Sequence, residues 1–312
     1  MKKFIITIDT EGDDLWNWKY GKNITTENVK YLPRFQQLAE AYGFKPVWLS
    51  NYEMISDNNY IKFVCDIESR QAGELGMHLH AWNNPPYYKL NQIRDSQPYL
   101  IEYPFEVMEE KISFLTNLIV QKTGIHPVSH RAGRWAMDNR YFDLLAKYNY
   151  KVDCSCTPHV NWEKSLGCTE TGIGSNYTNS SEKPMQIITN NNRKVLEVPM
   201  TIRLKHDFLL PSNFRLRTLA SSVYHMIFGK ASWLRPNGHN LNDMLRLASE
   251  ESNNDYIMFM IHSSELMPGG SPNFKTIESI DSLYNDIEKL FSFVAQNYDG
   301  CTLREYSQMK GL

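Results

Sequence analysis

The chain lacks any long hydrophobic run. Its opening apolar stretch, residues 4–8, has only five residues, whereas the central region of a secretion signal needs about 7–15. No segment approaches the ~20 apolar residues of a membrane-spanning helix. We therefore expect a cytoplasmic protein without a membrane span.

Cysteine is scarce and irregularly placed. The five cysteines, at positions 65, 154, 156, 168 and 301, form an odd set without the spacing of a disulfide scaffold. Such usage fits a reducing compartment. Cys154 and Cys156 lie two residues apart, but no second pair accompanies them, so we expect small buried side chains there rather than a metal site.

A surplus of charge of one sign is also missing. Charged residues make up 22% of the chain and the formal net charge is -2, so we expect no nucleic-acid partner. No internal repeat or low-complexity linker divides the sequence. Because 312 residues can bury one full core, we expect a single domain over 1–312 with insertions at about 157–192 and 205–239.

What the sequence does contain is an alternation of strand and helix patterns. A strand, a helix and a further strand in succession indicate a parallel sheet with crossover helices, and hence a barrel-like α/β domain. The expected strands are 4–8, 45–49, 74–80, 128–131, a strand from 151, 194–199 and 256–262. The expected helices include 25–42, 104–124 and 277–296, and a helix in the second insertion through Leu219, Val223, Met226 and Ile227.

Chemically active side chains gather at the ends of the expected strands. In parallel β/α folds, function collects there because the loops can vary while the scaffold stays fixed. A single strand-end histidine is more often a core residue than a ligand, but the joint placement indicates a site. The residues concerned are Asp9, Glu11, His78, His80, Arg131, Asp153 and His262.

Two of these histidines are spaced for metal binding. His78 and His80 lie two residues apart, so their imidazoles project to the same side of an extended strand. Two neutral imidazoles and a carboxylate can bind Zn²⁺ or a similar ion and leave one coordination position for water. The carboxylate is either Glu11 or Asp13, both in the acidic turn after the first strand.

The same residues fall in five separated motifs that resemble the polysaccharide deacetylase family, metal-dependent carbohydrate esterases that remove N-acetyl groups. Two motifs depart from the family pattern: the family usually spaces its histidines four apart, and a Pro-Tyr pair usually follows its arginine. The matches are 7–12 (TIDTEG), 78–80 (HLH), 130–133 (HRAG), 152–155 (VDCS) and His262. The segments 262–266 (HSSEL) and 233–236 (WLRP) look like a divergent branch associated with surface-polysaccharide biosynthesis.

The resemblance implies a distorted or incomplete (β/α) barrel, with the insertions on the strand-end face. It also implies a divalent metal, zinc by expectation, with cobalt, nickel or manganese as alternatives. Glu11, His78 and His80 would be the ligands. The implied catalytic roles are Asp9 as base, Arg131 as its anchor, His262 as general acid and Asp153 as the partner of His262.

Three functions are compatible with the sequence. The first is a metal-dependent deacetylase that hydrolyses an N-acetylated sugar by water attack. The second is a related hydrolase of other C–N bonds, such as a deformylase or amidohydrolase, on the same site. The third is a saccharide-binding relative without activity, which the two motif departures would allow. No oligomeric state is favoured.

Aromatic residues account for 12% of the chain and suit the faces of sugar rings, although core packing is at least as common a use. A cytoplasmic protein would meet a sugar precursor, such as a nucleotide- or lipid-linked sugar, rather than an exported polymer. The candidates for stacking are Trp16, Trp18, Trp82, Tyr87 and Tyr88.

Overall fold

The structure is a computed structural model that describes residues 1–17, 23–205, 230–250 and 254–312. The helix expected from Leu219 to Ile227 lies outside these ranges.

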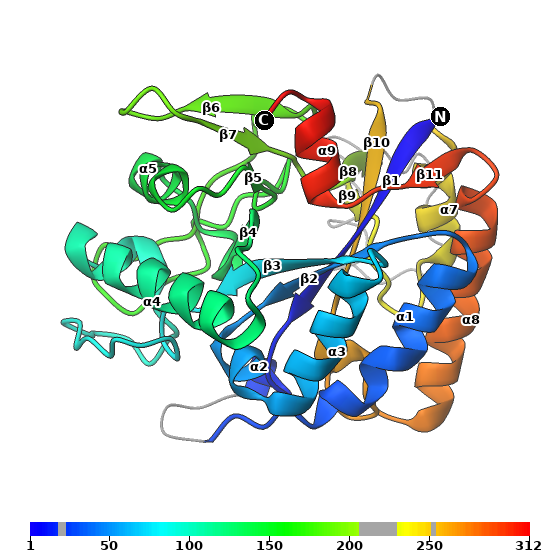
Figure 1. Cartoon of the computed structure of the whole chain (residues 1–312), viewed down its shortest axis with the longest axis horizontal. Helices are drawn as coiled ribbons and strands as arrows, with labels where there is room; N and C mark the ends of the chain where they lie inside the picture. Colours follow the sequence, from blue (N-terminus) through cyan, green and yellow to red (C-terminus); the bar gives the residue numbers. More distant parts are fainter. Residues whose placement is uncertain (18–22, 206–229, 251–253) are drawn as a thin grey trace, which may run out of the picture.

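One curled sheet organises the molecule (Figure 1). All its neighbouring strands are parallel except the last pair, β7 and β6, which is antiparallel. In spatial order the strands are β10 (Tyr256–His262), β1 (Lys2–Thr10), β2 (Pro46–Ser50), β3 (Glu74–Leu79), β4 (Ser129–Ala132), β5 (Val152–Asp153), β7 (Lys194–Glu197) and β6 (Met185–Ile188), with β11 (Tyr298–Gly300) also paired to β1. Every expected strand is therefore present, whereas β6 and β11 were not predicted.

The sheet bends round until segments from its far side reach the outer edge of β10. The backbone N–H of Met258 donates to the Thr201 hydroxyl at 2.8 Å, and that of Met260 donates to the Leu234 carbonyl at 3.1 Å. A separate antiparallel pair, β8 (Ile202–Lys205) and β9 (Lys230–Trp233), flanks these two segments. The result is a curled half-barrel, which confirms the predicted distorted (β/α) barrel.

Helices cover the outer face of the curled sheet (Figure 1). They are α1 (Leu32–Ala41), α2 (Tyr52–Ser56), α3 (Asn58–Ser69), α4 (Phe105–Thr123), α5 (Asn139–Lys147), α7 (Leu241–Ser249) and α8 (Ile277–Val294). The last helix, α9 (Leu303–Met309), instead packs Leu303 and Tyr306 against the inner core. Among the described residues, no helix is long and apolar enough to cross a membrane.

The boundaries of these helices follow local sequence signals. Pro33 falls at the first turn of α1, where its missing N–H costs nothing, and the residues before it form a separate 3-10 helix, Glu27–Tyr31. The single helix expected over 25–42 is thus two elements. Gly124 ends α4 with a φ of 72°, a left-handed conformation that glycine adopts without strain.

Alternation along the strands decides which side chains face the barrel interior. In β1, Ile6 and Ile8 pack in the core beneath the helices, whereas Ile5 belongs to the inner core. Thr7 and Asp9 must share that inner face, because successive strand residues point to opposite sides. The same rule turns His78, between the outward-packed Met77 and Leu79, toward the interior.

Candidate active site

Asp9, at the end of β1, is 2% exposed and is held by a buried arginine. Arg131 Nη1 donates to Asp9 Oδ1 at 2.5 Å, and its other nitrogens donate to the Thr7 hydroxyl (2.9 Å) and the Cys154 carbonyl (3.2 Å). Burial alone would raise the pKa of Asp9, but Arg131, His78 and His262 together lower it below its ordinary value. Asp9 is therefore an ionised carboxylate with one oxygen already engaged.

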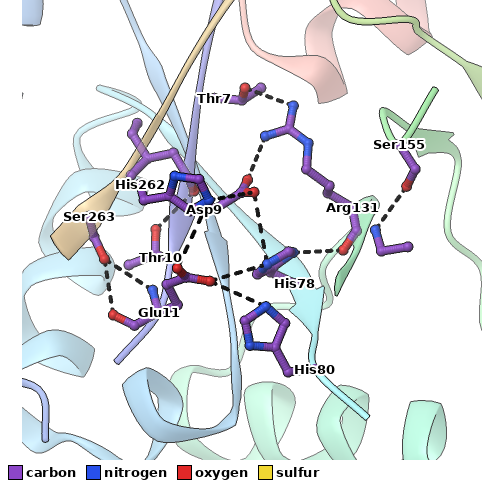
Figure 2. A network of polar contacts seen from close by, with 12 residues as sticks. Thr7, Asp9, Thr10, Glu11, His78, His80, Arg131, Ser155, His262 and Ser263 are labelled. Atoms are coloured by element: carbon purple, nitrogen blue, oxygen red, sulfur yellow. Dashed lines mark hydrogen bonds and ion pairs between the residues drawn. The ribbon is translucent and has the colours of Figure 1, made fainter. Parts of the chain in front are cut away.

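Glu11, His78 and His80 meet beside Asp9 (Figure 2). Glu11 Oε2 lies 3.5 Å from His78 Nε2 and 3.2 Å from His80 Nε2. One potential ligand atom from each of the three residues lies within 4.8 Å of the other two. All three side chains are buried, so the structure brings together the residues that the sequence proposed as a metal site.

The protonation pattern of this cluster suits a cation. His78 Nδ1 lies 2.9 Å from the Arg131 carbonyl, so it carries the proton and leaves the Nε2 lone pair facing Glu11. Burial opposes a charge on His78, yet Asp9 and Glu11 outweigh it and raise its pKa, so the carboxylates favour positive charge at this place, which a bound cation would supply instead of a proton. Burial and the neighbouring His78 lower the pKa of His80 well below its ordinary value, which keeps that imidazole neutral. The three residues therefore fit a divalent metal.

Asp13, the alternative carboxylate, serves another purpose. Its oxygens accept from the backbone N–H groups of Glu27 (2.7 Å) and Asn28 (3.0 Å) and from the Thr25 hydroxyl (2.7 Å). It thus caps the 3-10 helix that precedes α1. Between the two alternatives left by the sequence, the structure places Glu11, not Asp13, in the histidine cluster.

His262, the last residue of β10, pairs with Asp9 in the parallel register. Its Nε2 lies 3.9 Å from Asp9 Oδ2 and 4.0 Å from Glu11 Oε1. On the other side of the ring, Nδ1 lies 3.1 Å from Glu265 Oε2 and 3.0 Å from Arg235 Nη2. His262 therefore presents Nε2 to the acidic pair, while Nδ1 can donate to Glu265 when it carries a proton or accept from Arg235 when it does not.

Glu265 is fully buried in the 3-10 helix that follows β10, Ser263–Leu266. Burial favours its neutral form, but Arg235 and the hydrogen bonds from His262 lower its pKa to about 2. Its carboxylate is thus ionised beside the His262 ring. Neither Glu265 nor Arg235 was assigned a role from the sequence, although both lie in the segments that resemble the divergent branch.

The expected pairing of Asp153 with His262 is wrong. Asp153 Oδ1 instead lies 2.6 Å from His130 Nδ1, and His130 Nε2 lies 2.8 Å from the Tyr141 hydroxyl of α5. Alternation explains the difference: Val152 and Cys154 face the inner core, so Asp153 points outward with its register partner His130.

Asp153 still contributes to the architecture behind the site. Its carboxylate accepts from the Ser155 hydroxyl (2.9 Å), which in turn accepts from the backbone N–H of Ala132 (2.8 Å) next to Arg131. Burial and the Asp153 charge raise the pKa of Glu197 well above its ordinary value, so this neighbour is the protonated member of the pair. The network braces β4, the strand that carries Arg131, against β5.

The polar cluster forms the floor of a cavity of about 670 Å³, a size typical of small-molecule sites, about 300–1,000 Å³. Of the aromatic residues expected to contact sugar, Trp16 and Trp82 line it. Tyr87 and Tyr88 are 72% and 48% exposed and are not among its lining residues, while Trp18 lies outside the described residues. Three further aromatic side chains line the cavity without having been predicted to do so: Tyr99, Trp135 and Trp162.

Comparisons with known proteins bear on the fold. No protein-family model matches the chain, and no curated protein sequence matches it significantly. Among solved structures, a protein of Mycobacterium smegmatis assigned as a polysaccharide deacetylase is similar over 99% of this chain and 90% of its own, with a TM-score of 0.52 and 10% identity. The 4-alpha-glucanotransferase of Thermococcus litoralis is similar over 99% of this chain and 40% of its own, with a TM-score of 0.52 and 12% identity.

These likenesses confirm the resemblance to polysaccharide deacetylases at the level of the fold. The glucanotransferase has the same TM-score as the deacetylase, although this chain spans less than half of its length. The fold is therefore shared by proteins with different activities. The activity of this chain must be argued from its own site.

Proposed function

We propose that this chain is a metal-dependent hydrolase that removes an N-acetyl group from a sugar. The observation that carries the proposal is the placement of Asp9: Arg131 engages Oδ1, and Oδ2 lies 3.9 Å from both His78 Nε2 and His262 Nε2. This arrangement stands on the floor of an aromatic-lined cavity. It provides a base, an acid and a metal site within reach of one bound amide.

Glu11, His78 and His80 would hold the metal through one carboxylate oxygen and two Nε2 atoms. A bound divalent ion supplies polarisation of the acetyl carbonyl and lowers the pKa of a water molecule towards ~7. The carboxylate-and-imidazole donor set suits zinc, with cobalt, nickel and manganese as alternatives.

Asp9 is the proposed general base. Because Arg131 lowers the pKa of Asp9 and occupies Oδ1, Oδ2 is the oxygen left to take the proton from the attacking water. The buried guanidinium also prevents the carboxylate from rotating away. Arg131 therefore keeps the free oxygen of Asp9 in the same position from one catalytic cycle to the next.

His262 is the proposed general acid. Amide hydrolysis breaks the C–N bond, and the departing nitrogen needs a proton to leave as an amine. His262 Nε2 faces the acidic pair, and Glu265 would accept from the Nδ1–H of the ring. The water oxygen ends in acetate and the sugar keeps a free amine.

The experiment is a comparison of metal content and acetate release across matched variants. Glu11→Ala should lose both bound metal and activity toward N-acetylated hexosamine oligosaccharides. Asp13→Asn makes a similar loss of charge two residues away, outside the cluster, and should keep both. Metal bound equally by both variants would contradict the assigned site.

The choice of substrates separates the remaining alternatives. Release of formate, but not acetate, from matched N-acylated sugars would favour a deformylase on the same site. Binding of N-acetylated sugars with metal present and no acyl release would favour a non-catalytic relative. The cytoplasmic location and the precursor substrate remain predictions of the sequence.

A further inference from the structure

The cavity above the cluster has a wall formed by two long loops. One loop follows β3 and contributes Gln97 and Tyr99; the other follows β5 and contributes Trp162 and Ser165. The other lining residues include Trp16 after β1, Arg235 after β9 and His262 at the end of β10. Among the described residues, several strand ends of the curled sheet thus contribute to the cavity.

The two loops are joined by many hydrogen bonds. The backbone N–H groups of Ile93 and Arg94 both donate to the Cys168 carbonyl, at 2.9 and 3.1 Å. The Ser96 hydroxyl donates to the Leu166 carbonyl at 2.8 Å, and the Tyr99 hydroxyl donates to the Ser165 carbonyl at 2.6 Å. Such bonds make the wall one body, since neither loop can move without breaking several of them.

A single carboxylate sits at the centre of this junction. Glu102 accepts from the backbone N–H of Tyr99 at 2.6 Å and from both the N–H (2.8 Å) and the hydroxyl (2.7 Å) of Thr169. Glycines make room for it: a Cβ on Gly167 or Gly172 would lie 2.1 or 2.0 Å from a Glu102 oxygen. The hairpin 166–173, closed by an antiparallel bridge between Leu166 and Ile173, is therefore shaped around the Glu102 side chain.

Arg134 completes the wall on the side of the floor. Its Nη2 donates to the Leu166 carbonyl at 3.1 Å and its Nη1 donates to the Gln97 carbonyl, while its guanidinium lies 4.0 Å from the Tyr99 ring centroid. Both loops are thus fixed to the segment after β4 that also carries Trp135. A glycan crossing the floor toward this side would meet a fixed wall.

From this fixed wall, and resting on the proposed function, we propose that the cavity accepts a free or chain-terminal N-acetylated sugar and excludes residues in the interior of a polymer. One or two rings would enter between the aromatic side chains, with the acetyl group directed to Glu11 and the histidines. Further rings would extend outward into solvent and make no contact.

The first test is binding as a function of chain length. The metal-loaded Asp9→Asn variant, which should not turn over, is titrated calorimetrically with N-acetylhexosamine oligosaccharides of one to six units. We expect the Kd to stop changing by two units. A Kd that keeps falling, by tenfold or more between two and six units, would show an extended groove and overturn the proposal.

The second test opens the wall. Glu102→Ala should raise the affinity for six units relative to two by about tenfold, because the hairpin loses its anchor, whereas Glu106→Ala, an exposed carboxylate on α4, should not. If Glu102→Ala fails to fold, Gly172→Ala displaces the same carboxylate and carries the same expectation. If a folded Glu102→Ala or Gly172→Ala variant keeps the wild-type dependence of affinity on chain length, the proposed role of the wall is overturned.

The two proposals fail in different ways. If the affinity rises with chain length and acetate is released, the terminal specificity is rejected while the proposed deacetylase activity stands. Absence of binding to every N-acetylated sugar rejects the proposed function, and the terminal specificity with it.

Discussion

Replacing Asp9 with asparagine tests whether its buried charge has the two roles assigned to it. The substitution keeps the size of the side chain but removes the negative charge that faces Arg131, which is itself fully buried. A buried cation whose partner has been removed loses its compensation. Asp9→Asn should therefore abolish turnover, keep the metal and lower the free energy of unfolding.

The expected loss is about 3 kcal/mol, the lower end of the ~3–5 kcal/mol seen when one member of a buried ion pair is removed. The lower end applies because Arg131 keeps its bonds to Thr7 and the Cys154 carbonyl. With an unfolding entropy of about 2.1 cal/mol/K per residue, 3 kcal/mol corresponds to a fall in Tm of roughly 5 °C in a chain of this length.

Urea unfolding in the presence of a chelator measures this loss without a contribution from metal binding. The pKa of Asp9 is lowered in the folded state, so its stabilisation is present above the ordinary aspartate pKa of about 3.9. It is lost as the pH falls toward the folded pKa. The difference between wild type and variant should shrink below about pH 4. Because Asp9 also raises the pKa of His78, part of the difference should be lost as the pH rises above the ordinary histidine pKa of about 6.5.

Asp281→Asn is the matched control, since Asp281 forms an exposed pair with Arg34 at 3.1 Å. Exposed pairs contribute about 0–1 kcal/mol. If Asp9→Asn costs no more than this control, or if it retains wild-type turnover, the assignment of a buried, charged base is refuted.

Three further changes have defined outcomes. Glu265→Gln should lower kcat about 10²-fold and leave KM little altered, because His262 loses the carboxylate at Nδ1. This loss lies within the ~10²–10⁴-fold range of general acid catalysis. An unchanged kcat in steady-state assays would contradict the pairing of Glu265 with His262. His80→Ala should weaken zinc binding by more than about 100-fold in a chelator competition, whereas His239→Ala, an exposed histidine, should leave it unchanged. The Lys111 ammonium donates to the Ala81, Asn84 and Pro86 carbonyls at 2.7–2.8 Å. Because each carbonyl left unpaired costs ~1–3 kcal/mol, Lys111→Met should lower the free energy of unfolding by at least about 3 kcal/mol. A loss below about 1 kcal/mol by urea unfolding would show that these three bonds do not stabilise the fold.

The strands and the floor of the site were predictable because each depends on a short-range pattern. Period-two alternation along β3, continued one residue past its end at Leu79, places His78 and His80 on one face. Parallel pairing then brings the ends of β1, β3, β4 and β10 to one edge of the sheet. Asp9, Arg131 and His262 follow from that geometry.

Alternation could have excluded Asp153 as the partner of His262 but could not have identified Glu265. Asp153 and Glu265 are both carboxylates at or beyond strand ends, and spacing does not rank them. Alternation in β5 held a usable signal, because Val152 and Cys154 are the apolar members and Asp153 must then face outward. Glu265 instead reaches back within a 3-10 helix of four residues, too short to show a periodic pattern.

The cavity wall was also beyond sequence reasoning. Its loops carry little periodicity, and their mutual arrangement depends on bonds between residues about 70 positions apart, such as that from Ser96 to Leu166. The glycines that accommodate Glu102 signalled a turn in the sequence but not what they surround.

The pairing of β1 with β10 has a consequence for how the molecule is made. The Thr7 hydroxyl donates to the Phe259 carbonyl, 252 residues away. At about 5–20 residues per second, the ribosome needs roughly 13–50 s to deliver the second strand after the first. Throughout that interval the backbone N–H and C=O groups along one edge of the apolar strand β1 lack their partner strand, and they can pair with strands of other nascent chains. The reactive centre is consequently among the last parts of the molecule to assemble during synthesis.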